Sequence, residues 1–229
     1  MNKKIGIVFG ILIIIGLILF VSAETWAGEA FLNLDEGWNL VYGLFDVNQI
    51  QGLDTTHIKA IYGFVPTTQE YVRLYPEPDA EDLAILQGLE GEPFDFEEDF
   101  AQTAFWVYSD ISTEWNTKEF WLYDEIKPIE ERSLFKGWNF VGLTPDIIEQ
   151  PGDVDEPTLL DIQGNCDIEK AYLWLNGEWY DFDEIGRDVA ELESNLLLKG
   201  MVIKVSDDCT LNSAGSSSGG ITPPPIPSP

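Results

Sequence analysis

The three residues Gly-Trp-Asn occur twice in this sequence, and their repetition limits the possible folds more than any other feature. They stand at positions 37–39 and 137–139, each time before an apolar run, and the second Trp follows the first by one hundred positions. A long-period repeat usually marks supersecondary units that bury their apolar faces on one another. We therefore expect the 229 residues to form two similar modules in tandem.

Further matches extend the repeat across most of the chain. The paired segments are 50–52 with 162–164, 58–62 with 168–172, and 107–110 with 204–207, the last aligned on a shared Ser-Asp. Their offsets vary, as expected when loops of different length join shared elements. We place the first module at 31–111, a connector containing a strand at 112–133, and the second module at 134–211.

Local patterns predict a mainly β (α+β) fold with short helices, arranged as a sandwich or a barrel. Aromatic and β-branched residues favour strands, and they dominate 57–65 and 70–76, which we expect to form a hairpin. Asp79 and Asp82 resemble an N-cap pair that begins a short helix. A second helical stretch is expected at 183–196.

Asn176 and Gly177 predict a tight hairpin in the second module, because this pair tolerates the positive φ angles of a type I′ turn. The turn fixes the register, so that Trp174 faces Trp179. Side chains alternate between two faces of a strand. The expected core face contains Ala171, Leu173, Leu175, Tyr180 and Phe182, and the opposite face contains Tyr172, Trp174, Trp179 and Asp181.

This second face has two interpretations. As a ligand site, its rings would stack on sugar rings while Asp181 accepts hydrogen bonds from hydroxyl groups; Trp115 and Trp121 in the connector offer another such pair. As a structural element, the Trp174–Trp179 pair is buried under the 183–196 helix, whose apolar stripe needs a surface to cover. We favour burial for this reason.

Trp38 and Trp138 present the same choice between a ligand platform and a structural role. In the structural interpretation, Gly lets the chain enter the strand through a turn, Trp fills the core of the module, and Asn bonds to neighbouring backbone. Repetition at the same place in both modules favours the structural role.

The order of these elements resembles the GWN-type β-module, which occurs, often in tandem, in exported surface proteins of archaea and bacteria. The resemblance rests on the Gly-Trp-Asn strand, a strand ending in an aromatic residue, a turn with Gly, a Trp-Tyr strand, a leucine-rich stretch and a closing strand, and it covers nearly all of 31–211. The closing strands depart from the pattern, because 200–204 has no aromatic pair and 105–107 lacks the Gly and Lys. The resemblance implies a cell-surface building block and carries over no catalytic residues.

The N-terminal residues have the pattern of an export signal. Lys3 and Lys4 precede an uncharged stretch at 5–21, and Val21-Ser22-Ala23 fits a cleavage site. The stretch is long for a signal peptide and short for a membrane span, so 1–23 is either a cleaved signal peptide or a retained N-terminal transmembrane anchor helix. Both alternatives predict an extracellular or cell-surface protein. The Ser/Gly- and Pro-rich residues 212–229 predict a disordered tail.

Export and charge together restrict partners and ions. In an oxidising compartment, the only two cysteines, Cys166 and Cys209, are expected to form a disulfide. The 41 acidic residues against 12 basic ones give a net charge of −29, and phosphate repulsion excludes nucleic acid as a partner. No cofactor is expected, except that calcium suits clustered carboxylates. Its candidate ligands are Asp153, Asp155 and Glu156, with 97–99 as a second cluster, although a solvated acidic loop explains both.

The sequence lacks signals of catalysis. Its one histidine is His57, and neither HExxH nor GxSxG occurs. Paired carboxylates would suit a glycosidase, but so many acids give no specific signal. We therefore expect a non-catalytic, structural or adhesive protein of the cell surface whose partner is an envelope protein or polysaccharide. The alternatives are a carbohydrate-binding protein of the cell envelope and a divergent secreted hydrolase.

Overall fold

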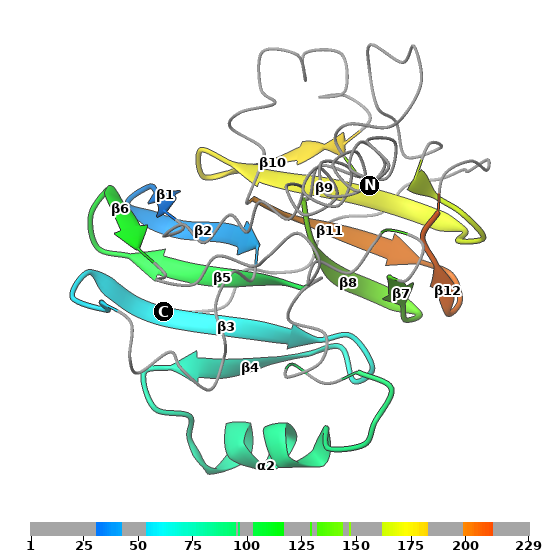
Figure 1. The fold of residues 1–229 in the computed structure, drawn as a ribbon, viewed down its shortest axis with the longest axis horizontal. Coiled ribbons are helices and arrows are strands. Elements are labelled where there is room, and N and C mark those ends of the chain that lie inside the picture. Colours follow the sequence, from blue (N-terminus) through cyan, green and yellow to red (C-terminus); the bar gives the residue numbers. More distant parts are fainter. Residues whose placement is uncertain are drawn as a thin grey trace, which may run out of the picture.

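The computed structural model describes residues 31–42, 54–94, 96, 103–116, 129, 132–143, 147, 162–182 and 199–212. Within these ranges the chain is mainly β, with antiparallel sheets and one short helix (Figure 1). The predicted β-rich class is therefore confirmed. The N-terminal segment 1–23, the helical stretch 183–196 and the tail from residue 213 lie outside the described residues.

Two four-stranded sheets contain most of the described strands. The first sheet has the order β2 (Gly37–Tyr42), β5 (Ala104–Ser109), β3 (Ile58–Val65), β4 (Glu70–Tyr75). The second sheet has the order β8 (Gly137–Gly142), β11 (Gly200–Val205), β9 (Ile168–Leu175), β10 (Glu178–Asp181). Two short pairs accompany them: β1 (Phe31–Leu34) with β6 (Thr113–Asn116), and β7 (Ser133–Leu134) with β12 (Cys209–Thr210). In chain order, each strand of the first half has a counterpart at the same place in the second half.

The hydrogen-bond register relates the two halves residue by residue. Gly37 pairs with Ser109 in the first sheet, and Gly137 pairs with Val205 in the second. Val205 is therefore the counterpart of Ser109, one position earlier than the Ser-Asp alignment predicted. The pairing of β5 with β2 and of β11 with β8 sets this correspondence along the whole strand, whereas a two-residue match carries no such constraint.

The predicted hairpin of the second sheet has the expected register. Trp174 pairs with Trp179, and Tyr172 pairs with Asp181. The φ angles of Asn176 and Gly177 are +52° and +82°, as a type I′ turn requires. The local turn chemistry was therefore sufficient to predict this pairing.

The one described helix, α2 (Ala80–Gly88), begins where the sequence predicts. The Asp79 carboxylate accepts hydrogen bonds from the backbone N–H groups of Glu81 and Asp82, and the Asp82 carboxylate accepts one from the N–H of Asp79. This reciprocal capping satisfies donors that a helix start leaves open. Asp82 also accepts from the N–H of Arg73 at 3.0 Å, which ties α2 to the edge strand β4.

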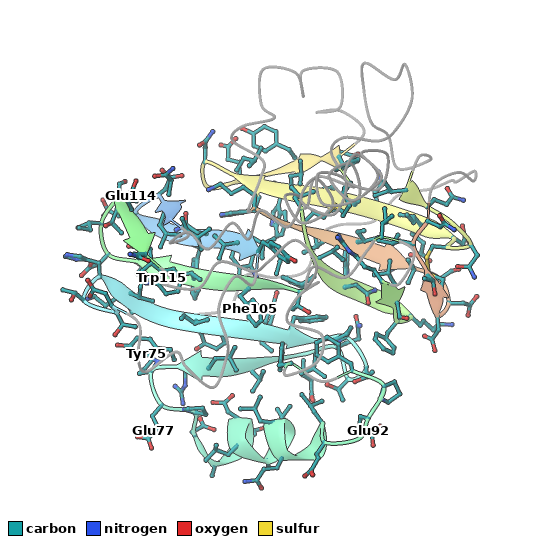
Figure 2. All side chains as sticks on the ribbon, viewed as in Figure 1. Tyr75, Glu77, Glu92, Phe105, Glu114 and Trp115 are labelled. Atoms are coloured by element: carbon teal, nitrogen blue, oxygen red, sulfur yellow. A yellow bond between two sulfur atoms is a disulfide. The ribbon has the colours of Figure 1, made fainter. Side chains whose placement is uncertain are left out.

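The strands β5 and β11, which lie inside the two sheets, are covered on both faces. The outer face of the first sheet packs on residues of β1, β6 and α2, and the outer face of the second packs on residues around β7 and β12. The remaining two faces meet, and Figure 1 shows β2 and β5 beside β11 and β8 in the middle of the fold. In Figure 2, Phe105 lies within the fold while Glu77, Glu92 and Glu114 lie at its surface. Double-sided burial explains why β5 and β11 are apolar at nearly every position instead of alternating.

The predicted disulfide is present and joins Cys166, in the turn before β9, to Cys209 in β12. Of the predicted core face, Ala171, Leu173 and Phe182 are buried, whereas Tyr180 is 36 % exposed. Tyr180 lies on β10, one of the two edge strands of its sheet, which pairs with a strand on one side only. Among the described residues, no helix is long and apolar enough to cross a membrane.

Candidate functional site

The two Gly-Trp-Asn segments form the same local structure. Gly37 and Gly137 have φ angles of +102° and +100°, a backbone conformation that favours glycine. Asn39 accepts from the N–H of Asp35 through Oδ1 at 2.8 Å, and its Nδ2 donates to the carbonyl oxygens of Asp35 and Gly37. Asn139 makes the matching three bonds to Phe135 and Gly137. Asn therefore bonds to neighbouring backbone, as the structural interpretation expected.

Trp38 and Trp138 are half-buried and lie at the margin of a cluster between the two sheets. They do not fill the outer core of their own half, which is where the sequence placed them. The strand periodicity explains this position, because Trp precedes the outward-packed Val41 and Val141 by three residues and so points to the opposite face.

The cluster between the sheets, called the central cluster below, contains most of the aromatic side chains considered as ligand platforms. Its members are Trp38, Leu40, Tyr62, Phe64, Tyr71, Ala104, Trp106, Trp138, Phe140, Tyr172, Trp174, Trp179 and Val202. Trp106 is fully buried, and its ring meets those of Trp174 and Trp179 edge-on at centroid distances of 5.3 and 5.7 Å. Such edge-to-face contacts are a favoured geometry for aromatic pairs.

Hydrogen bonds between the halves accompany the aromatic contacts. The Trp174 indole N–H donates to the carbonyl oxygen of Trp38 at 2.8 Å. The Gln69 side chain accepts from the N–H of Trp138 at 2.8 Å and donates to its carbonyl oxygen at 2.9 Å. The backbone at both edge strands, β2 and β8, is therefore engaged by the opposite half, and Lys199 Nζ adds a bond to the carbonyl oxygen of Asn33.

The structure places the four predicted ligand-binding residues on the face that meets the first sheet. Trp174 is 9 % exposed, Tyr172 and Trp179 are half-buried, and Asp181 forms an ion pair with Lys170 at 2.9 Å. The first sheet covers this face, which the sequence had assigned to the 183–196 helix. The first sheet presents aromatic residues of its own, among them Tyr62, Phe64 and Trp106, to the aromatic face of the second sheet. Their role in ligand binding stays a prediction.

One part of this face remains open to solvent. The rings of Trp138 and Tyr172 lie 6.2 Å apart with an interplanar angle of 39°, and both are half-buried. Lys170 Nζ stands 6.0 Å from the centroid of the Tyr172 ring and bonds to Asp181. Rings, an ammonium group and a carboxylate thus adjoin at the margin of the central cluster.

A shallow acidic hollow of about 350 Å³ lies between β4 and α2. Its lining residues are Glu70, Tyr71, Asp79, Glu81, Asp82 and Ile85. Arg73 forms ion pairs with Asp79 and Asp82 at 3.1 and 3.4 Å. Hydrogen bonds from the backbone N–H groups of Asp82 and Glu81 lower the pKa of Asp79. These carboxylates therefore already serve the helix cap and the edge of the sheet.

Metal binding finds no support among the described residues, which contain no group of three or more potential metal ligands. The predicted calcium ligands Asp153, Asp155 and Glu156, and the cluster at 97–99, lie outside the described part of the chain. The calcium expectation therefore stays a prediction.

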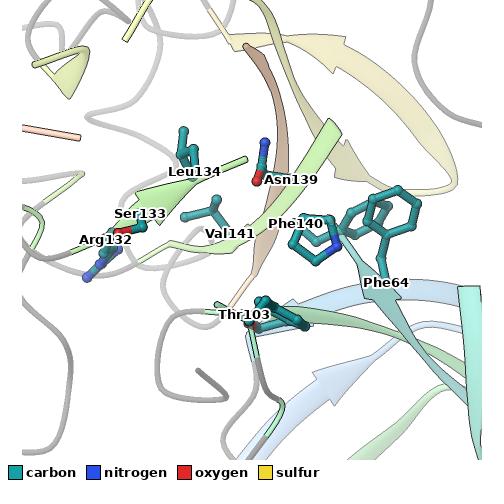
Figure 3. A pocket seen from close by; sticks show the side chains of 10 residues that line it. Phe64, Thr103, Arg132, Ser133, Leu134, Asn139, Phe140 and Val141 are labelled. Atoms are coloured by element: carbon teal, nitrogen blue, oxygen red, sulfur yellow. The ribbon is translucent and has the colours of Figure 1, made fainter. Parts of the chain in front are cut away.

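A small cavity lies between the halves, lined partly by Phe64, Thr103, Phe140 and the buried Arg132 (Figure 3). Its volume of about 20 Å³ is enough for roughly one water molecule. Arg132 Nη1 donates to the carbonyl oxygen of Gly142 at 3.3 Å. Sequence reasoning missed this buried arginine, because Arg132 follows Glu130 and Glu131 in a charged run that is typical of an exposed segment.

His57 belongs to a surface charge cluster. Its Nδ1 lies 3.0 Å from Asp110 Oδ1, and Lys59 Nζ lies 2.8 Å from Asp110 Oδ2. These hydrogen bonds, the one from Lys59 first, lower the pKa of Asp110. The adjacent Ser109 hydroxyl donates to the carbonyl oxygen of Ile111 at 2.7 Å. The arrangement is that of a surface ion pair at a strand end.

No protein-family model, curated protein or solved structure matches this sequence. The resemblance to GWN-type modules accordingly stays a prediction from the motifs.

Proposed function

We propose that this protein is an exported, cell-surface structural or adhesive protein built from two non-catalytic interaction modules of the GWN type. Its partner is an envelope protein or an envelope polysaccharide. The export signal pattern at 1–23 and the acidic composition motivate this location and this class of function.

The observation that carries the proposal is the use of the aromatic residues. Most of the side chains considered as a ligand platform pack one sheet on the other. Trp174 is 9 % exposed, and Trp106, which it contacts, is fully buried. Two sheets packed on each other and a disulfide suit a protein that presents its surface. The described hollows are small or already filled by ion pairs, which favours binding through exposed surfaces.

Protease treatment of intact cells tests the location. We expect protease to digest the protein on whole cells while a cytosolic marker stays intact. Full protection of the protein until the cells are lysed would contradict the proposal. Beads coated with the purified chain then test adhesion, and they should bind isolated envelopes more strongly than beads coated with an acidic control protein.

Carbohydrate binding is the second candidate, favoured by the half-buried Trp138–Tyr172 pair, with Asp181 beside Tyr172. Iodide quenching of tryptophan fluorescence separates the two functions. If the central cluster is purely structural, emission is blue-shifted, weakly quenched and unaffected by envelope polysaccharide. If the site binds sugar, polysaccharide protects the quenchable fraction and Trp138→Phe removes this protection, whereas the matched variant Trp38→Phe retains it.

A further inference from the structure

The central cluster is built from corresponding residues of the two halves. The register of the two sheets pairs Trp38 with Trp138, Leu40 with Phe140, Tyr62 with Tyr172, Phe64 with Trp174, Tyr71 with Trp179, and Trp106 with Val202. The last member, Ala104, corresponds to Gly200. Each half therefore contributes the same patch of its surface, as in the isologous interface of a symmetric dimer.

Backbone bridges between the halves obey the same symmetry. Val41 bridges to Lys199, and Val141 bridges to Thr103. Val141 is the counterpart of Val41, and Thr103 is the counterpart of Lys199. In a two-fold contact, residue i of one unit meets residue j of the other, and the reverse contact also occurs. The two sheets are thus related by a local two-fold axis within one chain.

Two contacts lie on this axis, because there a residue meets its own counterpart. A Cβ atom on Gly200 would collide with the Cβ of Ala104 and approach Leu40 Cγ to 2.7 Å. A Cβ atom on Gly142 would collide with the ring of Tyr42, its counterpart. At both places, the larger residue belongs to the first half and the glycine to the second.

This difference in side-chain size favours the pairing of a first half with a second half over the pairing of two identical halves. Two first halves would bring Tyr42 against Tyr42 and Ala104 against Ala104, in space that now admits only glycine. Overpacking of this kind is destabilising. At these two contacts, two second halves would meet without collision but would lose the Tyr42 ring and the Ala104 methyl group, leaving unfilled volume.

We propose that this face is a pairing surface whose two on-axis contacts, Tyr42–Gly142 and Ala104–Gly200, make a first half accept a second half and reject a copy of itself. A second copy of the chain therefore docks on this face only by exchange, in which the first half of each chain packs on the second half of the other chain. The specificity holds whether or not the protein is adhesive, so it does not depend on the proposed function.

A rescue experiment in the full chain tests the on-axis contact. Gly200→Ala places an alanine against Ala104 and should lower the melting temperature, because the two Cβ atoms collide. Adding Ala104→Gly inverts the pair and should restore part of the loss, because the approach to Leu40 Cγ remains. Ala171→Gly, a buried strand position of the outer core, is the matched control and should restore nothing. Equal melting temperatures for Gly200→Ala with and without Ala104→Gly would overturn the proposal, as would rescue by the control.

A mixing experiment tests docking by a second copy. Exchange between a Gly200→Ala chain and an isotope-labelled Ala104→Gly chain relieves the collision, because it pairs each alanine with a glycine. Refolded together with their disulfides intact, the two chains should give a heterodimer by native mass spectrometry, and Gly200→Ala should be recovered folded even if it fails to fold alone. Separate monomers, or homodimers in equal amount, would overturn exchange through this face.

Discussion

At the scale of single residues, the side chains of Asn39 and Asn139 explain why Gly-Trp-Asn occurs in both halves of the chain. Each side chain satisfies one N–H and two carbonyl groups of the turn that leads into its strand, and each residue is almost fully buried. Replacing Asn139 by Ala would leave those backbone groups without partners. We expect a loss of about 3 kcal/mol in the free energy of unfolding, measured by urea denaturation.

Asn39→Ala should cost the same amount within error, because its three bonds are the same. The exposed Asn33, whose side chain lies at the surface of β1, provides the control. A loss below about 1 kcal/mol for either buried residue would mean that water replaces these bonds.

Tyr71 should make stability depend on alkaline pH. Burial raises its pKa to about 12, while a free tyrosine has a pKa of about 10. The folded state therefore holds the phenol proton more tightly, so this contribution is complete below pH about 10 and is lost as pH rises toward about 12. Urea midpoints measured across this range should fall less steeply for Tyr71→Phe than for the parent chain.

At the scale of elements, the two halves fasten β6 and β12 to the loops before β3 and β9 by different chemistry. In the second half, Cys209 of β12 is bonded to Cys166. In the first half, the buried Trp115 of β6 donates from its indole N–H to the carbonyl oxygen of Asp54 at 3.0 Å. A large side chain with one hydrogen bond thus joins these elements in the first half, and a covalent link joins them in the second.

Trp115→Ala should destabilise the chain by about 4 kcal/mol through the cavity it leaves. Trp115→Phe keeps most of the packing and loses the hydrogen bond, so it should cost about 1 kcal/mol. Chemical denaturation of the two variants measures both values. Equal costs for Phe and Ala would show that the hydrogen bond, and not the packing, holds this strand.

At the scale of the whole molecule, the central cluster makes each half depend on the other. Trp106 of the first half packs on Trp174 and Trp179 of the second, so unfolding either half exposes a face of the remaining one. We expect a single calorimetric transition whose van't Hoff enthalpy equals its calorimetric enthalpy. Two resolved transitions would instead show that each half is stable alone.

Much of the local structure follows from the sequence. The Asn176-Gly177 turn, the capping by Asp79 and the pairing of Trp174 with Trp179 were all predictable, because each depends on residues close together in the chain. The expectation of export, together with the presence of only two cysteines, made the cysteine pairing predictable as well.

The match between the two sheets was decided only in three dimensions. Alternation showed that Tyr172, Trp174 and Trp179 share one face, but that face packs on the other half of the chain, from Trp38, 136 positions before Trp174, to Trp106, and the sequence alone pointed to a neighbouring helix instead. Local pattern fixes which side chains share a face, since strand geometry has a period of two. Which surface covers that face depends on shape and on pairs such as Tyr42 with Gly142, and these become apparent only when the chain is folded.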